Sequence, residues 1–181
     1  MTEIQLEQLK YPVGKWQKPE TITLEQLKQY IATIALFPDK LRKQVALLNQ
    51  GQLDTPYRPG GWSVRQVVHH CADSHLNSFI RFKLALTEDK PTVKPYDEER
   101  WAELPDAKTM PVEPSLLLLD GLHARWTHLL TNLQPEQFAY SFVHPQQQRN
   151  MRLDEILCLY DWHCRHHLAH ITTLKLSQDW A

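Results

Sequence analysis

Four long stretches of this sequence repeat their apolar residues with the period of an α-helix, and this pattern limits the folds open to the chain. They cover about residues 24–48, 64–87, 115–133 and 153–176. Pro38 interrupts the first stretch, so we expect a kink or a new helix there. The connections differ in length, and residues 88–113 are rich in proline and charge. The sequence therefore predicts an all-α four-helix bundle with a long crossover loop.

Two of these helices carry clear start signals. Thr23 and Gln26 have the spacing of a capping box, and so do Ser63 and Gln66. Trp62 would then act as a hydrophobic staple just before the second helix. Outside the four helices we expect an irregular stretch over residues 1–20, a loop over 50–61, a short helix near 97–103, and a short strand or a loop within 138–151.

Length and composition exclude several classes of protein. A chain of 181 residues predicts one domain, covering residues 1–181. The net charge is −1 and no basic run occurs, so nucleic acid is a poor candidate partner. The longest apolar run, Leu116 to Leu119, is far shorter than the roughly 20 residues of a membrane helix. Three cysteines without a CxxC motif indicate no disulfide framework. With no secretory signal at the start, we expect a cytoplasmic protein that binds no membrane.

Histidines are frequent and clustered in the last predicted helix. The chain has ten, and four of them are His163, His166, His167 and His170. Positions four apart nearly coincide on a helix surface, so these four form two interleaved pairs. Such a pair can hold zinc from one helix face, as in the HExxH motif, which this chain lacks. The alternative is a set of ordinary polar or half-buried histidines, although burying several imidazoles without partners is costly.

A second helix must supply any further ligand, and the helix over residues 64–87 offers three histidines. They are His69, His70 and His75. His75 lies among the apolar positions, whereas His70 lies in a polar stripe. That stripe suits either a solvated surface or the polar wall of a site inside the bundle, and periodicity alone does not decide. The histidines at 123 and 128, on the third helix, are expected to lie outside the site.

Several motifs occur in a distinctive order along the chain. They are Tyr11-Pro12-Val13-Gly14, Pro59-Gly60-Gly61-Trp62-Ser63-Val64-Arg65-Gln66-Val67-Val68-His69-His70, Lys94-Pro95-Tyr96 with Trp101, and His163 through His170-Ile171-Thr172. Together they resemble the DinB/YfiT-like metalloenzyme family, most closely its YfiT branch, over nearly the whole chain. The resemblance implies a four-helix bundle, a homodimer, and one divalent metal ion per chain, Zn²⁺ or Ni²⁺. Its ligands would be His70, His163 and His167, and no role is implied for His166 or His170.

The same resemblance implies an enzyme that acts on a small molecule, either as a metal-dependent hydrolase or as a bacillithiol-type thiol S-transferase. An ion with open positions lowers the pKa of a bound water to about 7, and it can equally hold a thiolate. No glutamate adjoins the three ligands in the sequence, which favours thiol transfer. The catalytic residues stay unknown, although Asp73, Asp154 and Asp161 are possible bases.

A non-catalytic metal-binding or small-ligand-binding protein is the alternative. A structural zinc ion normally has four protein ligands, and His75, His166 or His170 could be the fourth. In either case the ligands must be neutral, so unperturbed imidazoles would release the ion as the pH falls through about 6.5.

Overall fold

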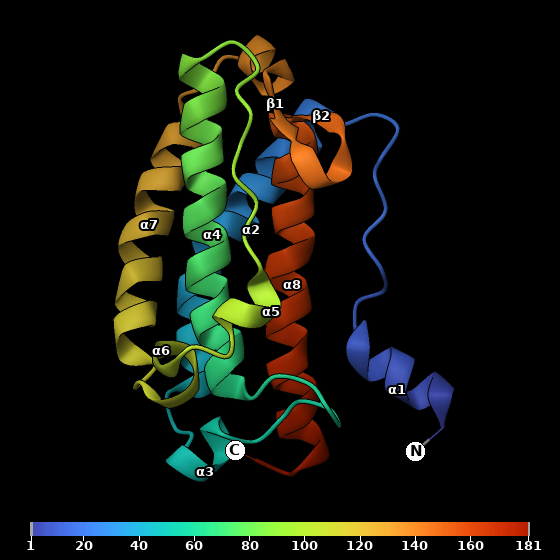
Figure 1. Cartoon of the computed structure of the whole chain (residues 1–181), viewed down its shortest axis with the longest axis vertical. Coiled ribbons are helices and arrows are strands. Elements are labelled where there is room, and N and C mark those ends of the chain that lie inside the picture. The colour runs from blue at the N-terminus through green and yellow to red at the C-terminus, as the bar shows by residue number, and fades with distance from the viewer. Residues whose placement is uncertain (1, 181) are drawn as a thin grey trace.

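The computed structural model describes residues 2–180, and four long helices dominate it (Figure 1). They are α2 (Leu24–Val45), α4 (Val64–Thr87), α7 (Glu113–Thr131) and α8 (Leu153–Ser177). The shorter elements are α1 (Glu3–Lys10), α3 (Gln50–Leu53), α5 (Glu98–Trp101), α6 (Pro105–Thr109), two 3-10 turns at Pro135–Ala139 and Pro145–Gln147, and the strands β1 (Ser141–His144) and β2 (Arg149–Arg152). The predicted all-α four-helix bundle is confirmed.

The order of helices around the bundle differs from the order along the chain. α2 and α4 each pack against both α7 and α8, so α2 and α4 lie diagonally across the bundle. The crossover between α4 and α7 carries α5 and α6 and returns along the bundle (Figure 1). As a result α4 and α7 run in the same direction. This arrangement places α4 directly beside α8, the two helices that carry most of the histidines.

The capping boxes form as predicted, and they fix where helices begin. The backbone N–H of Gln66 donates to Ser63 Oγ at 3.2 Å, and Ser63 N–H donates to Gln66 Oε1 at 2.9 Å. A third box, between Thr2 and Gln5, opens α1. The prediction of an irregular start was therefore wrong for residues 3–10. Thr2 and Gln5 have the capping-box spacing, and this local signal starts the helix before the turn residues at 11–20.

Pro38 does not end its helix. α2 continues from Leu24 to Val45, so the new helix considered beyond Pro38 does not form. The flanking residues Ile34, Phe37 and Leu41 are fully buried, and this packing holds the helix together across the proline. Proline has no N–H, so the carbonyl of Ile34 lacks its usual partner four residues on. His123 Nδ1 lies 2.6 Å from that carbonyl oxygen and takes the place of the missing donor.

The segment between α7 and α8 forms a small hairpin rather than a loop. β1 and β2 are antiparallel, with Phe142 opposite Met151, and both of these side chains are buried. The crossover adds a parallel bridge to β1, where Val93 N–H donates to the carbonyl of Val143 at 3.0 Å. The crossover is thus fixed against the bundle. No helix within residues 2–180 is long and apolar enough to cross a membrane.

Candidate metal centre

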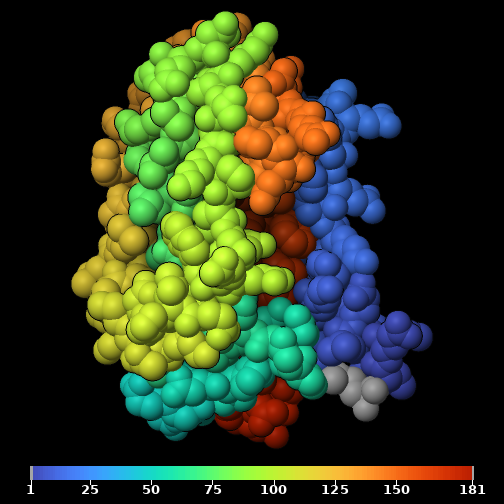
Figure 2. Space-filling view, in the orientation of Figure 1, coloured from blue at the N-terminus to red at the C-terminus, as the bar shows by residue number. Residues whose placement is uncertain are grey.

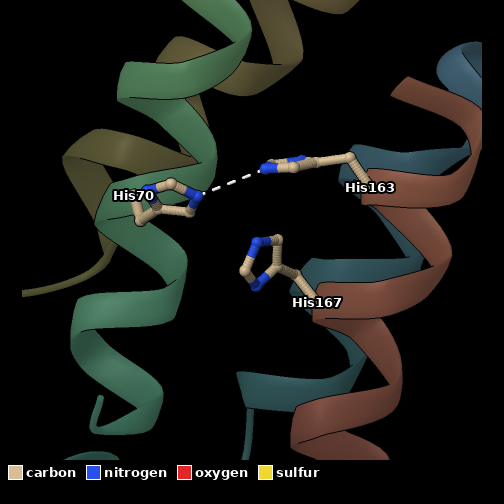
Figure 3. Close-up of side chains that lie close together, drawn as sticks. All are labelled: His70, His163 and His167. Atoms are coloured by element: carbon tan, nitrogen blue, oxygen red, sulfur yellow. Dashed lines mark hydrogen bonds between the residues drawn. The ribbon is translucent and has the colours of Figure 1, made fainter. Parts of the chain in front are cut away.

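Three histidines from two adjacent helices point into one space. His70 comes from α4, and His163 and His167 come from successive turns of α8 (Figure 3). The Nε2 atoms of His70 and His163 lie 3.2 Å apart, and one ring nitrogen from each of the three residues lies within 4.8 Å of the others. The structure thus brings together the three residues that the sequence and the resemblance suggested.

The spacing of these nitrogens suits a small divalent ion. Nitrogens bound tetrahedrally to zinc at about 2.0–2.1 Å lie roughly 3.3 Å from each other. The 3.2 Å between His70 and His163 is close to that value. Nδ1 of His167 is buried and has no hydrogen-bond partner within the described chain, so binding of an ion at this nitrogen would break no existing hydrogen bond. The donor set therefore fits a metal ion that prefers imidazole.

Burial keeps these three imidazoles neutral, as metal ligation requires. Desolvation lowers the pKa of His70 to about 3, and the nearby His166 adds to this effect. Burial also lowers the pKa values of His163 and His167 well below the ordinary range, with further contributions from the neighbouring histidines. Neutral rings present lone pairs, so protons compete weakly with a metal at neutral pH.

The three nitrogens open onto a cavity of about 610 Å³. In Figure 2 the red surface of α8 lies at the floor of a hollow between the crossover, the hairpin and the N-terminal segment. The rest of the cavity wall mixes aromatic, basic and acidic side chains: Lys10, Tyr11, Tyr57, Arg58, Trp62, Gln66, Glu98, Glu99, Glu103, Trp162, His166 and His170. The indole of Trp62 packs on the ring of His70, with centroids 4.6 Å apart, in addition to its place before α4. Such a cavity suits a small polar molecule.

His166 and His170 form a second histidine group with His167. One nitrogen from each of the three lies within 4.8 Å of the others. Nε2 of His170 donates to the carbonyl of Lys10 at 3.2 Å, and its ring stacks on Tyr57. Nδ1 of His166 and Nδ1 of His170 are buried without a hydrogen-bond partner among the described residues. These two side chains thus line the cavity beside the first group and share His167 with it.

Two further histidines, His75 and His123, lie on the side of His163 that faces away from His70. His75 Nε2 lies 3.0 Å from His163 Nδ1, the nitrogen on the far side of the ring from Nε2. His75 Nδ1 lies 2.7 Å from His123 Nε2. His123 was expected outside the site, and it lies two hydrogen bonds from a proposed ligand. Periodicity placed His75 correctly among the apolar positions, but it carries no information about which buried polar groups meet.

The acids considered as possible bases lie outside the cavity, and two of the three cysteines lie in the core. Asp161 pairs with Arg165 at 2.7 Å and Asp154 with Arg152 at 2.6 Å. Asp73 is not among the residues that line the cavity, although burial raises the pKa of its carboxyl to about 6. Cys71 and Cys164 are buried, and burial raises the pKa values of both thiols, so they are inert core residues.

The carboxylates that line the cavity come from the crossover, and the sequence pattern did not mark them as site residues. Glu98, Glu99 and Glu103 all line the cavity wall. Although much of Glu98 faces solvent, partial desolvation raises the pKa of its carboxyl, and the charges of Glu99 and Asp97 add to that effect. The absence of a glutamate next to the ligands in sequence therefore does not mean an absence of carboxylates in space.

Comparison with known proteins gives consistent results. The family model described as the DinB superfamily matches residues 34–171. The "Putative metal-dependent hydrolase YfiT" of Bacillus subtilis (strain 168) is 50% identical over 96% of this chain and 97% of its own length. A Bacillus mycoides (strain KBAB4) protein, also named as a "Putative metal-dependent hydrolase", is 51% identical over 97% of this chain and 100% of its own length.

A solved structure agrees with these relatives. It is described as "YfiT from Bacillus subtilis is a probable metal-dependent hydrolase with an unusual four-helix bundle topology". It superposes with a TM-score of 0.93 at 49% sequence identity, and the match covers 96% of this chain and 99% of that chain. That structure is described as a four-helix bundle, and the four long helices of this chain form one as well.

Proposed function

This chain belongs to the DinB superfamily, and we propose that it is a metal-dependent hydrolase of a small polar molecule, with one divalent ion held by His70, His163 and His167. The observation that carries the proposal is the convergence of three neutral imidazoles at the wall of a cavity of about 610 Å³. The names of the relatives support the same reaction class.

The proposed ligands leave coordination positions free on the cavity side. A divalent ion in such a site supplies a Lewis acid and lowers the pKa of a bound water to about 7. The protein residues bind and orient the substrate. Trp62 and Tyr57 add aromatic surface to the cavity wall, while Lys10 and Arg58 offer positive charge to an anionic group.

Glu98 is the group we propose as the base. It lines the cavity, and its raised pKa brings the carboxyl nearer to the range useful for proton transfer at neutral pH. We expect Glu98→Gln to lower kcat by roughly 10²–10⁴-fold, the usual contribution of a general base. Metal content should stay unchanged, since Glu98 is not a ligand. The measurement is hydrolysis of a panel of small esters and amides, with Glu136→Gln on the surface as the control.

The donor set also favours a second candidate, transfer of a thiol to an electrophile. Three neutral imidazoles leave the ion's charge uncompensated, and a thiolate would offset it. We expect a cobalt-substituted protein to show a sulfur-to-cobalt charge-transfer band if a low-molecular-weight thiol is the co-substrate, and the band should vanish in His167→Ala. A metal spectrum that no cellular thiol perturbs, together with cleavage of esters or amides in water alone, would favour the hydrolase.

A non-catalytic structural ion is the remaining alternative. Such a site needs a fourth protein ligand. His75 contacts the far side of the His163 ring instead, which argues against this residue as the fourth. X-ray absorption of the zinc-loaded protein measures the ligand number directly. Three imidazoles plus a light oxygen ligand would support the enzyme, and four imidazoles would support the structural ion.

A further inference from the structure

Two buried histidines, His123 and His75, connect the backbone of α2 to the proposed metal ligand His163. The row of hydrogen bonds begins at the carbonyl of Ile34, continues through His123 and His75, and ends at His163. Successive distances are 2.6, 2.7 and 3.0 Å. His75 and His123 are 0% and 1% exposed, so the described surroundings leave their rings no access to bulk water. Phe37 packs against both rings.

The first member of the row sets the position of every proton in it. A carbonyl oxygen can only accept, so Nδ1 of His123 carries the proton that it donates to Ile34. In a neutral ring Nε2 of His123 is then an acceptor, and Nδ1 of His75 must donate to it. By the same step Nε2 of His75 accepts from Nδ1 of His163. One proton on each ring satisfies all three hydrogen bonds.

From this order we infer that the Ile34 carbonyl, His123 and His75 are positioning groups that hold His163 in its Nδ1–H form, with the lone pair of Nε2 directed at His70 and His167. The inference rests on the proposed metal site, because it assigns these residues a role toward the ion. The opposite tautomer of His163 would place a proton on the nitrogen that faces His70 and would block ligation.

Pro38 explains why the row can start where it does. In an unbroken helix the carbonyl of Ile34 would accept from the N–H of residue 38. Proline removes that donor, which leaves the carbonyl free for an imidazole from α7. Pro38, which the sequence suggests as a helix breaker, thus frees the Ile34 carbonyl from which the row of hydrogen bonds starts. Three of the four bundle helices, α2, α7 and α4, would in this way act on a ligand held by the fourth.

The direct test is the tautomer of each histidine in the metal-free protein. Two-dimensional ¹⁵N–¹H correlation of ring nitrogens, with protein labelled in histidine, distinguishes Nδ1–H from Nε2–H. We expect His75, His123 and His163 all in the Nδ1–H form. His163 in the Nε2–H form in the wild-type protein would overturn the inference, whatever the fate of any variant.

Metal affinity in matched variants is the second readout. We expect His75→Leu to weaken binding of Zn²⁺ by about 10–100-fold, the usual cost of losing an outer-shell partner. His75→Gln offers an amide oxygen to His163 Nδ1–H and should recover most of that loss. The exposed His128→Ala should behave as wild type.

These two readouts separate the inference from the proposed function. If wild type binds Zn²⁺ and both His75 variants bind it equally well, the positioning role is wrong while the metal site stands. If wild type binds no metal, the proposed function is wrong, and Nδ1–H tautomers in the metal-free protein would still support the proton order of the row.

Discussion

His70→Ala, His163→Ala and His167→Ala will each abolish stoichiometric binding of a divalent ion. Each change removes one of three nitrogens that meet in a single space. We expect the dissociation constant to rise by more than 100-fold, beyond the 10–100-fold typical of outer-shell partners. Metal content after dialysis, together with competition against a chromophoric chelator, measures the effect. Hydrolytic activity should fall with it.

The second histidine group makes this experiment more discriminating. An ion held by His166, His167 and His170 would survive His70→Ala and His163→Ala but not His166→Ala. We expect the opposite pattern, with full metal content in His166→Ala and in His128→Ala. Undiminished metal in His163→Ala would therefore refute the proposed ligand set, and retention that depends on His170 would move the ion along α8.

The long helices of this fold could be predicted from the sequence because each carries its own local signal. The apolar period located α4 and α8 to within a residue or two, and a capping box marked the start of α4. The new helix considered at Pro38 does not form, because a proline removes only one hydrogen bond and packing can compensate for that loss. The short elements α1, α3 and α6 have few residues each, so little periodicity is available to identify them.

The site shows a different limit. The i, i+4 spacing placed His163 and His167 on one helix face, and their partner on α4 came from a family resemblance rather than from the pattern. Periodicity treats His70 as an ordinary polar position, although it is buried against α8. Glu98 and His123 were missed because their place depends on which helices become neighbours, and that is a property of the topology. The choice between Zn²⁺ and Ni²⁺ and the homodimer stay predictions.

Acid will unfold the metal-free protein at an unusually high pH, because so many neutral histidines are buried in it. Burial lowers the pKa of His70 and His170 to about 3, and of His123 and His166 to about 4. The unfolded chain binds a proton at each of these rings below about pH 6.5, whereas the folded chain does not. The stability that these neutral histidines contribute is therefore fully present above pH 6.5. It is lost progressively as the pH falls from 6.5 toward the pKa values of the folded chain.

The loss of folding free energy on acidification should be large enough to measure in urea denaturation. Each such histidine contributes about 1.4 kcal/mol per pH unit in that interval. At pH 5.5 the four together cost about 6 kcal/mol, which is comparable with the whole free energy of unfolding of a typical domain, about 5–15 kcal/mol. We expect the urea midpoint, followed by far-ultraviolet circular dichroism, to fall steeply between pH 7 and pH 5.5. His128→Ala, an exposed position, should leave the slope unchanged.

The metal-loaded protein gives the complementary result. An ion binds only neutral imidazoles, so it stabilises the folded chain against protonation. Since the ligand histidines already have lowered pKa values in the folded chain, the ion should not leave near pH 6.5, as it would from unperturbed imidazoles. Metal release should instead coincide with unfolding at lower pH. Release near pH 6.5 from a protein that remains fully helical would show that the ligands are exposed histidines rather than this buried group.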